Sequence, residues 1–361
     1  MNKNYYAIIM AGGIGSRFWP ISRTSYPKQF IDILGTGKTL IQNTYDRFIK
    51  ICPPENIYIV TNENYADLVK EQLPGIADHQ ILTEPVMRNT APCVAYGSYK
   101  IESMNEDAIV VVAPSDHLIL NEQAFIDSIN NSLNTAAEHD CLITLGIKPS
   151  RPDTGYGYIQ YTDQLLNNDF HKVKTFTEKP TLEIAKSFIQ SGDFLWNAGI
   201  FVWSAKSIVK AFGKHLPDMH DIFADARSVY NSEKERSHIN TAYQQCINIS
   251  IDYGIMEKAE NVYVLPSEFG WSDLGTWTSV YQLAEKDYVG NAVIPAEKVI
   301  MYDSSNCMVN VPEDKLVVLQ GLHDFIVVEA NNTLMICPRD QEQSVKQIVA
   351  DVKQKFGTKY I

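Results

Sequence analysis

The chain has 361 residues, of which 45% are hydrophobic and 20% are charged. This composition is typical of a globular protein, and the length suits a large domain with a smaller one beside it. No run approaches the roughly 18 charge-free apolar residues of a membrane span, so we expect no membrane-spanning helix. The net charge of −12 argues against non-specific nucleic-acid binding.

The cysteines, the histidines and the N-terminus all favour a cytoplasmic protein without a zinc site. The six cysteines lie far apart with no C-x-x-C pair, and the eight histidines show no H-x-x-x-H spacing. The first residues lack the pattern of a signal peptide. We therefore expect reduced thiols and a cytoplasmic location.

Strand and helix patterns alternate along the first 150 residues. Apolar runs predict five buried strands: 5–10, 57–61, 80–83, 108–113 and 141–146. Helical patterns separate these strands: 39–50, 63–73, 91–104 and 122–137. This alternation predicts an α/β fold with a Rossmann-like, doubly wound and mostly parallel sheet, whose ligands bind at the carboxyl ends of the strands.

The middle of the chain changes character. The runs 156–161, 170–176 and 194–203 read as strands, and Thr181 caps an amphipathic helix after the second of them. We interpret this part as an insertion that forms the second wall of a cleft. It completes a catalytic domain that we expect over residues 1–288.

The last part of the chain is rich in short strand patterns. From about Asn291, runs of about five residues recur between turn sequences, which predicts a small stacked β unit, such as a left-handed β-helix. A final helix is expected to begin at Asp340, with Gln343 placed for a capping box. Its apolar stripe belongs either to the core or to a dimer contact: Val345, Ile348, Val349 and Val352. We assign residues 289–361 to this C-terminal domain.

A glycine-rich loop follows the first strand. Residues 11–20 read AGGIGSRFWP, and glycines there let backbone N–H groups approach phosphate oxygens. Every charged residue before Asp32 is basic, which suits a compact anionic ligand, although charge alone fits a solvated basic edge equally well. A Rossmann fingerprint requires glycine where Phe18 stands, and a Walker A loop requires glycine where Asp32 stands. Neither pattern fits.

A longer run carries a resemblance to a known family. Residues 12–30, GGIGSRFWPISRTSYPKQF, resemble the signature of the sugar nucleotide pyrophosphorylases, and the W-P-x-S-R and P-K-Q-F forms resemble mannose-1-phosphate guanylyltransferases (GDP-mannose pyrophosphorylases). Further segments follow in that family's order: EPVMRNTAP at 84–92, PSDH at 114–117, GYGYI at 155–159, EKP at 178–180, WNAGIF at 196–201, DYGIMEK at 252–258 and GWSDLGTW at 270–277. The resemblance covers essentially the whole chain and implies the short, single-function form without an isomerase domain.

The resemblance implies a reaction and its partners. A member of this family transfers GMP from GTP to α-D-mannose 1-phosphate, giving GDP-mannose and pyrophosphate by Mg²⁺-assisted in-line attack on the α-phosphorus. The implied partners are GTP, mannose 1-phosphate and a second copy of the chain bound through the C-terminal domain. Nucleic acid and membrane are not expected as partners.

The resemblance also implies catalytic roles for four residues. Arg17 and Lys28 would bind phosphates, and Asp116 and Asp273 would hold one magnesium ion. Each residue also has a structural interpretation. Lys28 would otherwise be a surface lysine after a proline, Asp116 a turn residue or cap, and Asp273 the cap of the helix that carries Trp277.

The remaining implied contacts fall into two sets. The nucleotide-binding set is Gly12, Gly13, Gly15, Glu84, Arg88, Asn89 and Ala91. The sugar-phosphate set is Gly155, Tyr156, Gly157, Glu178, Lys179 and Asn197. Glu84 offers acceptors to guanine N1–H and NH₂, while Arg88, Asn89 or a backbone N–H offers a donor to O6.

Several alternatives stay open at this point. Residues 89–92 can also be read as a plain helix start, with Thr90 as the cap and Pro92 in the first turn. Asp252 and Glu257 receive no role. The chain fits an active guanylyltransferase, a related pyrophosphorylase with another sugar or base, or a non-catalytic regulatory relative. Retention of Arg17, Lys28 and both aspartates favours the first over the third.

Overall fold

The computed structural model describes residues 1–295 and 297–361, and the chain forms two compact units. Unit 1 comprises Met1–Gly12, Thr44–Ser115 and Ile119–Trp271. Unit 2 comprises Gly13–Asn43, Asp116–Leu118 and Ser272–Ile361. Neither unit is one continuous run of sequence. The domain boundary expected between residues 288 and 289 stays a prediction.

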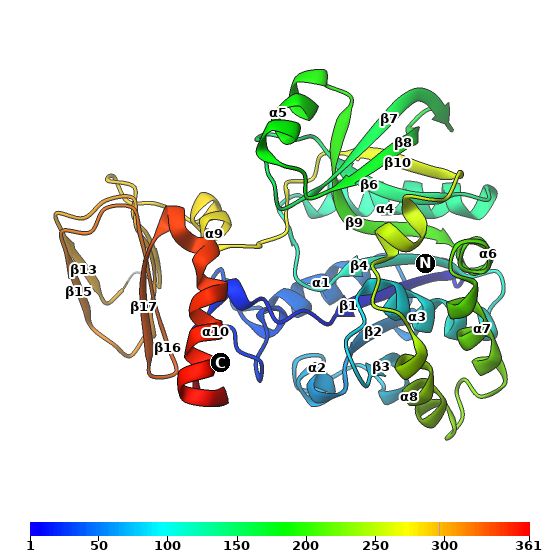
Figure 1. The fold of residues 1–361 in the computed structure, drawn as a ribbon, viewed down its shortest axis with the longest axis horizontal. Helices are drawn as coiled ribbons and strands as arrows, with labels where there is room; N and C mark the ends of the chain where they lie inside the picture. Colours follow the sequence, from blue (N-terminus) through cyan, green and yellow to red (C-terminus); the bar gives the residue numbers. More distant parts are fainter. Residues whose placement is uncertain (296) are drawn as a thin grey trace. The chain divides into compact units, whose positions relative to one another are not determined.

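A nine-stranded sheet forms the centre of unit 1 (Figure 1). Its order is β3-β2-β1-β4-β9-β6-β10-β8-β7. The bounds are β1 Tyr5–Ala11, β2 Ile57–Asn62, β3 Ile81–Glu84, β4 Ile109–Pro114, β6 Leu142–Ile147, β7 Gly157–Leu166, β8 Phe170–Glu178, β9 Phe194–Ser204 and β10 Val262–Ser267. The short strands β5 (Leu118–Ile119) and β11 (Trp271–Ser272) lie where the chain passes between the units.

The sheet is parallel in one part and mixed in the other. β1 pairs in parallel with β2 and β4, and β2 does so with β3, as expected for a doubly wound fold. β9 runs antiparallel between β4 and β6 and also pairs with β7, while β8 pairs antiparallel with β7 and β10. The strands that we interpreted as an insertion therefore extend the same sheet.

Helices cover both faces of this sheet, which confirms the predicted α/β doubly wound class (Figure 1). Their bounds are α1 Leu40–Phe48, α2 Ala66–Gln72, α3 Thr90–Met104, α4 Glu122–Glu138, α5 Leu182–Ser191, α6 Ala205–His215, α7 Pro217–Asp225 and α8 Glu235–Gln245. Side chains of α3, α6, α7 and α8 share one core with Tyr6 and Ile8 of β1. Strands buried on both faces read as continuous apolar runs, and Ala7, Ile8 and Ile9 are fully buried.

Unit 2 contains the small stacked β unit that the sequence predicted. Its strands are β12 Ala292–Ile294, β13 Val299–Tyr302, β14 Met308–Asn310, β15 Val317–Gln320, β16 Phe325–Ala330 and β17 Thr333–Pro338. β12, β14 and β16 pair in parallel, β13 pairs in parallel with β15, and β17 closes antiparallel on β16. Successive strands thus alternate between two sheets, as the turns of a β-helix do.

The N-terminal segment 13–43 belongs to the core of unit 2. Phe18, Trp19 and Ile33 share a buried cluster with Trp277 and Met308, and the Phe18 and Trp277 rings meet edge-on at 5.1 Å. The helix α9 (Trp277–Leu283) is capped by Thr276, whose hydroxyl accepts from Ser279 N, so the alternative interpretation of Asp273 as the cap is wrong. The polar residues after the glycine loop are therefore anchored on an apolar core.

The final helix begins later than expected. A 3-10 helix, η8, spans Arg339–Ser344, and α10 spans Val345–Phe356 without a side-chain cap. The capping box predicted at Asp340 and Gln343 is wrong because the Gln343 amide instead accepts a hydrogen bond from Arg17 Nε at 3.0 Å. The apolar stripe packs on the core of unit 2: Val345, Ile348, Val349 and Val352.

Other short turns complete the description. The 3-10 helices are η1 Ser16–Phe18, η2 Lys28–Phe30, η3 Pro54–Asn56, η4 Glu63–Tyr65, η5 Asp78–Gln80, η6 Ala226–Ser228 and η9 Gly357–Tyr360, and η7 (Asp252–Met256) is a π-helix. All six cysteines are free and buried. Among residues 1–295 and 297–361, no helix is both long and apolar enough to cross a membrane.

Candidate active site

In unit 2, three oxygen partners surround the ammonium group of Lys28. Lys28 begins η2 and is 4% exposed. Its Nζ lies 2.9 Å from Asp116 Oδ2 and donates to the carbonyls of Asp273 at 2.8 Å and Leu274 at 2.9 Å. We call this arrangement the lysine centre. It brings together three of the four residues to which the sequence assigned catalytic roles.

The lysine centre keeps Asp116 charged. Burial by itself raises the pKa of this carboxyl, but the charges of Lys28 and His117 and the hydrogen bond from Lys28 outweigh it, so the pKa falls below its usual value. Asp273 Oδ1 accepts from Gly275 N at 3.0 Å, which fixes the second carboxylate. Both carboxylates therefore carry hard oxygen atoms in fixed positions.

The carboxylate oxygens of Asp116 and Asp273 are of the chemical kind that Mg²⁺ binds. Within the described part of the chain, no group of three or more His, Cys, Asp or Glu side chains could hold a metal alone. Mg²⁺ is commonly bound by one or two carboxylates together with phosphate oxygens and water. The donor set of Asp116 and Asp273 matches that pattern.

The glycine loop packs directly against Lys28. Gly15 has a φ of +69°, and a Cβ atom there would lie 2.4 Å from Lys28 Cβ. The carbonyl of Ile14 accepts from Lys28 N at 3.2 Å. In contrast, a Cβ atom at Gly13 would meet nothing within 4 Å. Arg17, in η1, is partly exposed and is oriented by its bond to Gln343.

In unit 1, Glu84 lies at the carboxyl edge of the parallel strands. It ends β3 and is 4% exposed. Its Oε1 accepts from Tyr243 OH at 2.9 Å, and its Oε2 lies 3.7 Å from where a Cβ atom on Gly12 would be. Burial raises the pKa of Glu84 to about 7, against the opposing effect of the Tyr243 hydrogen bond. Tyr243 was not found by sequence reasoning.

Residues 89–92 do form a helix start, as one sequence interpretation expected, but the cap differs. Asn89, with a φ of 67°, caps the helix through its own side chain, so the expected cap at Thr90 is wrong. Thr90 Oγ1 accepts from Ile251 N, and Ala91 N donates to Ile249 O. The N–H groups of Thr90 and Ala91 are thus occupied within the chain. Pro92 does lie in the first turn.

Arg88 carries a polar atom that protein groups leave unsatisfied. Among the described residues, Arg88 Nε is buried and has no hydrogen-bond partner. A buried donor without a partner costs on the order of 1–3 kcal/mol, more when charged, and calls for an explanation such as a ligand. This atom therefore supports the donor role that the sequence suggested for Arg88.

The residues assigned to the sugar come together in unit 1. Gly157 pairs with Glu178 across β7 and β8, and a Cβ atom on Gly157 would lie 2.5 Å from Glu178 Oε2 and 3.5 Å from Asn197 Cβ. Glu178 Oε1 pairs with Lys179 Nζ at 2.6 Å. A side chain at position 157 would therefore displace the Glu178 carboxylate.

The two residues before Gly157 shape its turn. Gly155 N donates to Asp153 Oδ1 at 2.8 Å. The ring of Tyr156 packs edge-on against Trp196 at 4.9 Å and Trp271 at 5.2 Å between ring centroids. Tyr156 and Gly155 therefore support the sugar-side residues as well as lying next to them in sequence.

Asp252 joins this group, although the sequence gave it no role. Asn197 Nδ2 donates to Asp252 Oδ1 at 2.7 Å, while Asn197 Oδ1 accepts from Thr144 Oγ1 and Gly199 N, each at 3.0 Å. Burial, and then the charge of Glu178, raises the pKa of Asp252 to about 6. Burial and the nearby Asp252 also raise the pKa of Glu257.

Residues 249–252 connect the two groups of unit 1. Ile249 and Ile251 bond to the start of α3, and Asp252 bonds to Asn197. The nucleotide-side and sugar-side residues of this unit thus share one short support. The sequence did contain a signal for Asp252, because the DYGIMEK segment matches the resembled family. That match did not reveal which residues Asp252 contacts.

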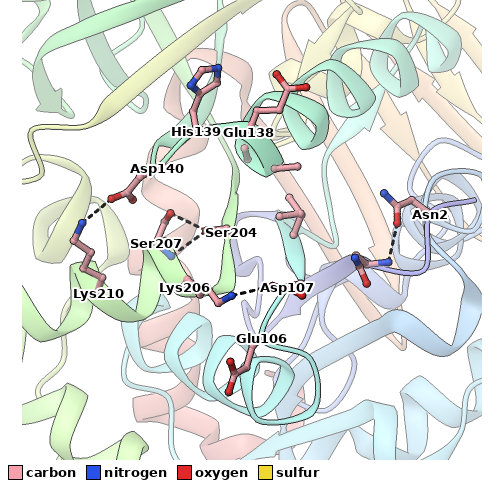
Figure 2. A pocket seen from close by; sticks show the side chains of 14 residues that line it. Asn2, Glu106, Asp107, Glu138, His139, Asp140, Ser204, Lys206, Ser207 and Lys210 are labelled. Carbon is pink, nitrogen blue, oxygen red and sulfur yellow. Dashed lines mark hydrogen bonds and ion pairs between the residues drawn. The ribbon is translucent and has the colours of Figure 1, made fainter.

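A separate hollow of about 550 Å³ lies at the opposite edge of the sheet, where β4 begins (Figure 2). Two exposed ion pairs lie in it, Lys206–Asp107 at 2.8 Å and Lys210–Asp140 at 2.6 Å. Its lining contains none of the residues to which the sequence assigned a role. We interpret it as solvated surface.

Comparison with known proteins places the chain. The family model "Nucleotidyl transferase" matches residues 6–289, and the model "MannoseP isomerase/GMP-like beta-helix domain" matches residues 297–352. The chain belongs to the nucleotidyl transferase family. The expected class of enzyme is confirmed.

Individual proteins similar to this chain indicate its group within the family. The "Alginate biosynthesis protein AlgA" of Pseudomonas syringae pv. tomato is 36% identical over 97% of this chain and 72% of its own length. The mannose-1-phosphate guanylyltransferase of Salmonella montevideo is 35% identical over 96% of this chain and 73% of its own length. A crystal structure described as mannose-1-phosphate geranyltransferase from Thermus thermophilus has a TM-score of 0.86 at 30% identity, and covers 97% of this chain and 99% of its own. The resemblance to mannose-1-phosphate guanylyltransferases is thus confirmed.

Proposed function

We propose that this nucleotidyltransferase transfers GMP from GTP to α-D-mannose 1-phosphate and releases pyrophosphate. The lysine centre carries the proposal, because it presents a buried ammonium group and two fixed carboxylates. The names of the similar proteins support guanylyl as the transferred group and mannose 1-phosphate as the acceptor.

The chemistry requires cations because two polyanions must meet. At about 4 Å, each pair of unit charges repels by roughly 4 kcal/mol at an effective dielectric of 20. Lys28 supplies a fixed positive charge, and Arg17 supplies a planar fork of donors for the triphosphate and for charge that develops on the leaving pyrophosphate. The backbone of Gly12, Gly13 and Gly15 can approach the phosphates closely. The attacking phosphate oxygen is already ionised, so no general base is needed.

Asp116 and Asp273 would hold a magnesium ion in this proposal. When bound, Mg²⁺ neutralises phosphate charge and helps to align the reacting groups. The contribution of the chain is to keep Asp116 ionised through Lys28 and to fix Asp273 through Gly275.

We propose that Glu84 and Arg88 recognise the guanine base. The carboxylate of Glu84 would accept from guanine N1–H and the exocyclic NH₂, and the unpaired Arg88 Nε would donate to O6. Asn89 and Ala91 would act through the helix start that positions Arg88, since their polar groups already hold that turn.

The sugar-side residues have complementary proposed roles. Glu178 would accept from sugar hydroxyls, Lys179 would hold the 1-phosphate, and Asn197 would bind a further hydroxyl through its amide nitrogen. That nitrogen has a second hydrogen to offer, whereas Asn197 Oδ1 already has two donors. Residues 155–157 would let the backbone approach the hexose.

A matrix of nucleotides and sugars tests this function. We expect pyrophosphate release with GTP and mannose 1-phosphate, with kcat/KM for GTP exceeding that for ATP by at least about 10²-fold. A site built for specific polar groups rejects a base that leaves them buried and unpaired. Rates with ATP or dTTP equal to the rate with GTP would contradict the guanylyl assignment. A higher rate with another hexose 1-phosphate than with mannose 1-phosphate would identify a related pyrophosphorylase. No release with any pair would favour a non-catalytic relative.

We further propose a homodimer through the C-terminal β unit. Ile300 of β13 and Val318 of β15 are aligned in register and are 43% and 55% exposed. Tyr302 and Leu316 are exposed near them, and an exposed apolar row on a small sheet is a common mark of an interface. We expect Ile300→Glu with Val318→Glu to convert a dimer into a folded monomer in sedimentation at micromolar concentration. A wild-type monomer would refute the proposal.

A further inference from the structure

Tyr243 is a buried polar residue without a place in the proposed chemistry. It lies near the end of α8 and is fully buried. Its hydroxyl donates to Glu84 Oε1 at 2.9 Å. The other oxygen of that carboxylate, Oε2, lies on the side of Gly12, where the glycine loop begins. One oxygen is thus held by the protein, and the other is left toward the nucleotide side.

The far end of α8 is anchored independently. Glu235 begins the helix, and its carboxylate binds Lys100 Nζ at 2.7 and 2.6 Å, Tyr96 OH at 2.7 Å and Asn231 N at 2.6 Å. Tyr96, Lys100 and Glu235 are buried, so the start of the helix is fixed against α3. A helix held in this way gives the Tyr243 hydroxyl a defined position relative to β3.

We infer that Tyr243 is a positioning residue for base recognition, whose hydroxyl holds Glu84 Oε1 so that Oε2 faces the guanine. The inference rests on the proposed function. A hydrogen bond from a neutral donor to a buried carboxylate favours the charged form, and only the charged form offers acceptors at both oxygens. Tyr243 therefore acts on both the direction of the carboxylate and its protonation.

The groups around Glu84 leave Tyr243 as the donor that matters near neutral pH. Burial raises the pKa values of the Tyr243 hydroxyl and the Cys93 thiol, so both stay neutral. Asn62 Nδ2 bonds to the main-chain carbonyl of Glu84 and not to its carboxylate. Burial places the Glu84 pKa at about 7, and loss of the tyrosine hydroxyl would raise it further because that bond lowers it.

The sign of the pH effect follows from these groups. Protonated Glu84 predominates below about pH 7, and it offers fewer acceptors to guanine. In wild-type protein we expect KM for GTP to rise about tenfold between pH 8 and pH 6, as a single group of pKa about 7 requires. In Tyr243→Phe the same rise should begin at higher pH.

The test compares KM for GTP in Tyr243→Phe and in wild type at several pH values. Phosphate ionisation is common to both proteins, so it cancels in the ratio of the two KM values. We expect a ratio of about fivefold at pH 7, which falls below about twofold at pH 8.5. KM for mannose 1-phosphate should change less than about twofold.

A matched control comes from the other end of α8, where Tyr96 of α3 donates to Glu235. Tyr96→Phe also removes a buried tyrosine hydroxyl from a buried carboxylate, but Glu235 keeps its bonds to Lys100 and Asn231. Its KM ratio should stay near one at every pH. A similar pH-dependent rise in Tyr96→Phe would assign the effect to general loosening of α8 and overturn the inference.

A second variant keeps the inference testable if Tyr243→Phe folds poorly. Glu84→Gln cannot titrate, so its KM for GTP should lose the pH step, and adding Tyr243→Phe to it should not restore or shift one. A KM ratio that stays near one at every pH in Tyr243→Phe would overturn the inference while wild-type GTP preference remained. Absence of that preference in wild type would instead refute the proposed function.

Discussion

Replacing Asp116 with asparagine is expected to lower kcat by about 10³-fold while the protein remains folded. The change removes a carboxylate proposed to bind magnesium, and a bridging cation contributes several kcal/mol of charge stabilisation. It also removes the ion pair with Lys28, although Lys28 keeps the carbonyls of Asp273 and Leu274. Asp273→Asn should have an effect of similar size, and excess EDTA should abolish wild-type activity.

Asp107→Asn is a control that removes the same charge away from the proposed magnesium site. Asp107 forms an exposed ion pair with Lys206 at 2.8 Å in the hollow of Figure 2. Exposed pairs of this kind contribute little to stability, so Asp107→Asn should keep kcat within about twofold. Steady-state rates and thermal melting of the three variants provide the measurement. Wild-type turnover in excess EDTA would refute the magnesium role.

Sequence reasoning grouped residues that the structure brings together where those residues lie in local motifs. Gly157, Glu178 and Asn197 were assigned to one ligand, and the structure places both Glu178 and Asn197 beside the position that a Cβ atom on Gly157 would take. Lys28 and Asp116 were assigned to one reaction, and they form an ion pair. The parallel strands could also be predicted from the sequence, because strands covered on both faces give continuous apolar runs.

It failed where a single hydrogen bond connects distant segments. Tyr243 and Asp252 reach Glu84 and Asn197 from other parts of the chain, and neither contact leaves a periodic signal. The predicted start of the final helix was wrong for the same reason, since the Gln343 side chain accepts a hydrogen bond from Arg17. A local pattern also cannot tell which of two apolar cores a segment will join.

The placement of segment 13–43 has consequences for the site. Phe18, Trp19 and Ile33 lie in the core of unit 2, so the turn that contains Gly15 is held from one side by this core. On its other side the turn contacts Lys28. The position of the lysine centre therefore depends on the backbone conformation at one glycine.

Gly15→Ala is expected to lower kcat by at least about 10²-fold. A Cβ atom at this position would lie 2.4 Å from Lys28 Cβ and 3.2 Å from its Cγ and Cδ, and the φ of +69° adds strain of roughly 1–2 kcal/mol. The closest atom is Cβ, next to the main chain, so the clash cannot be relieved by a rotation at the far end of the side chain. Lys28 must shift, and its bonds to Asp116 and to the carbonyls of 273 and 274 shift with it.

Gly37→Ala is a control that introduces backbone strain without a clash with Lys28. Gly37 also belongs to unit 2 and has a φ of +84°, but a Cβ atom there would meet nothing within 4 Å. Both substitutions should therefore lower the free energy of unfolding by a similar strain term, measured by urea denaturation, while only Gly15→Ala should also lose turnover. Misplacing a catalytic group by about 1 Å can cost about 10²-fold in rate, which sets the expected size. Equal turnover in the two variants would show that the lysine centre does not depend on the contact between Gly15 and Lys28.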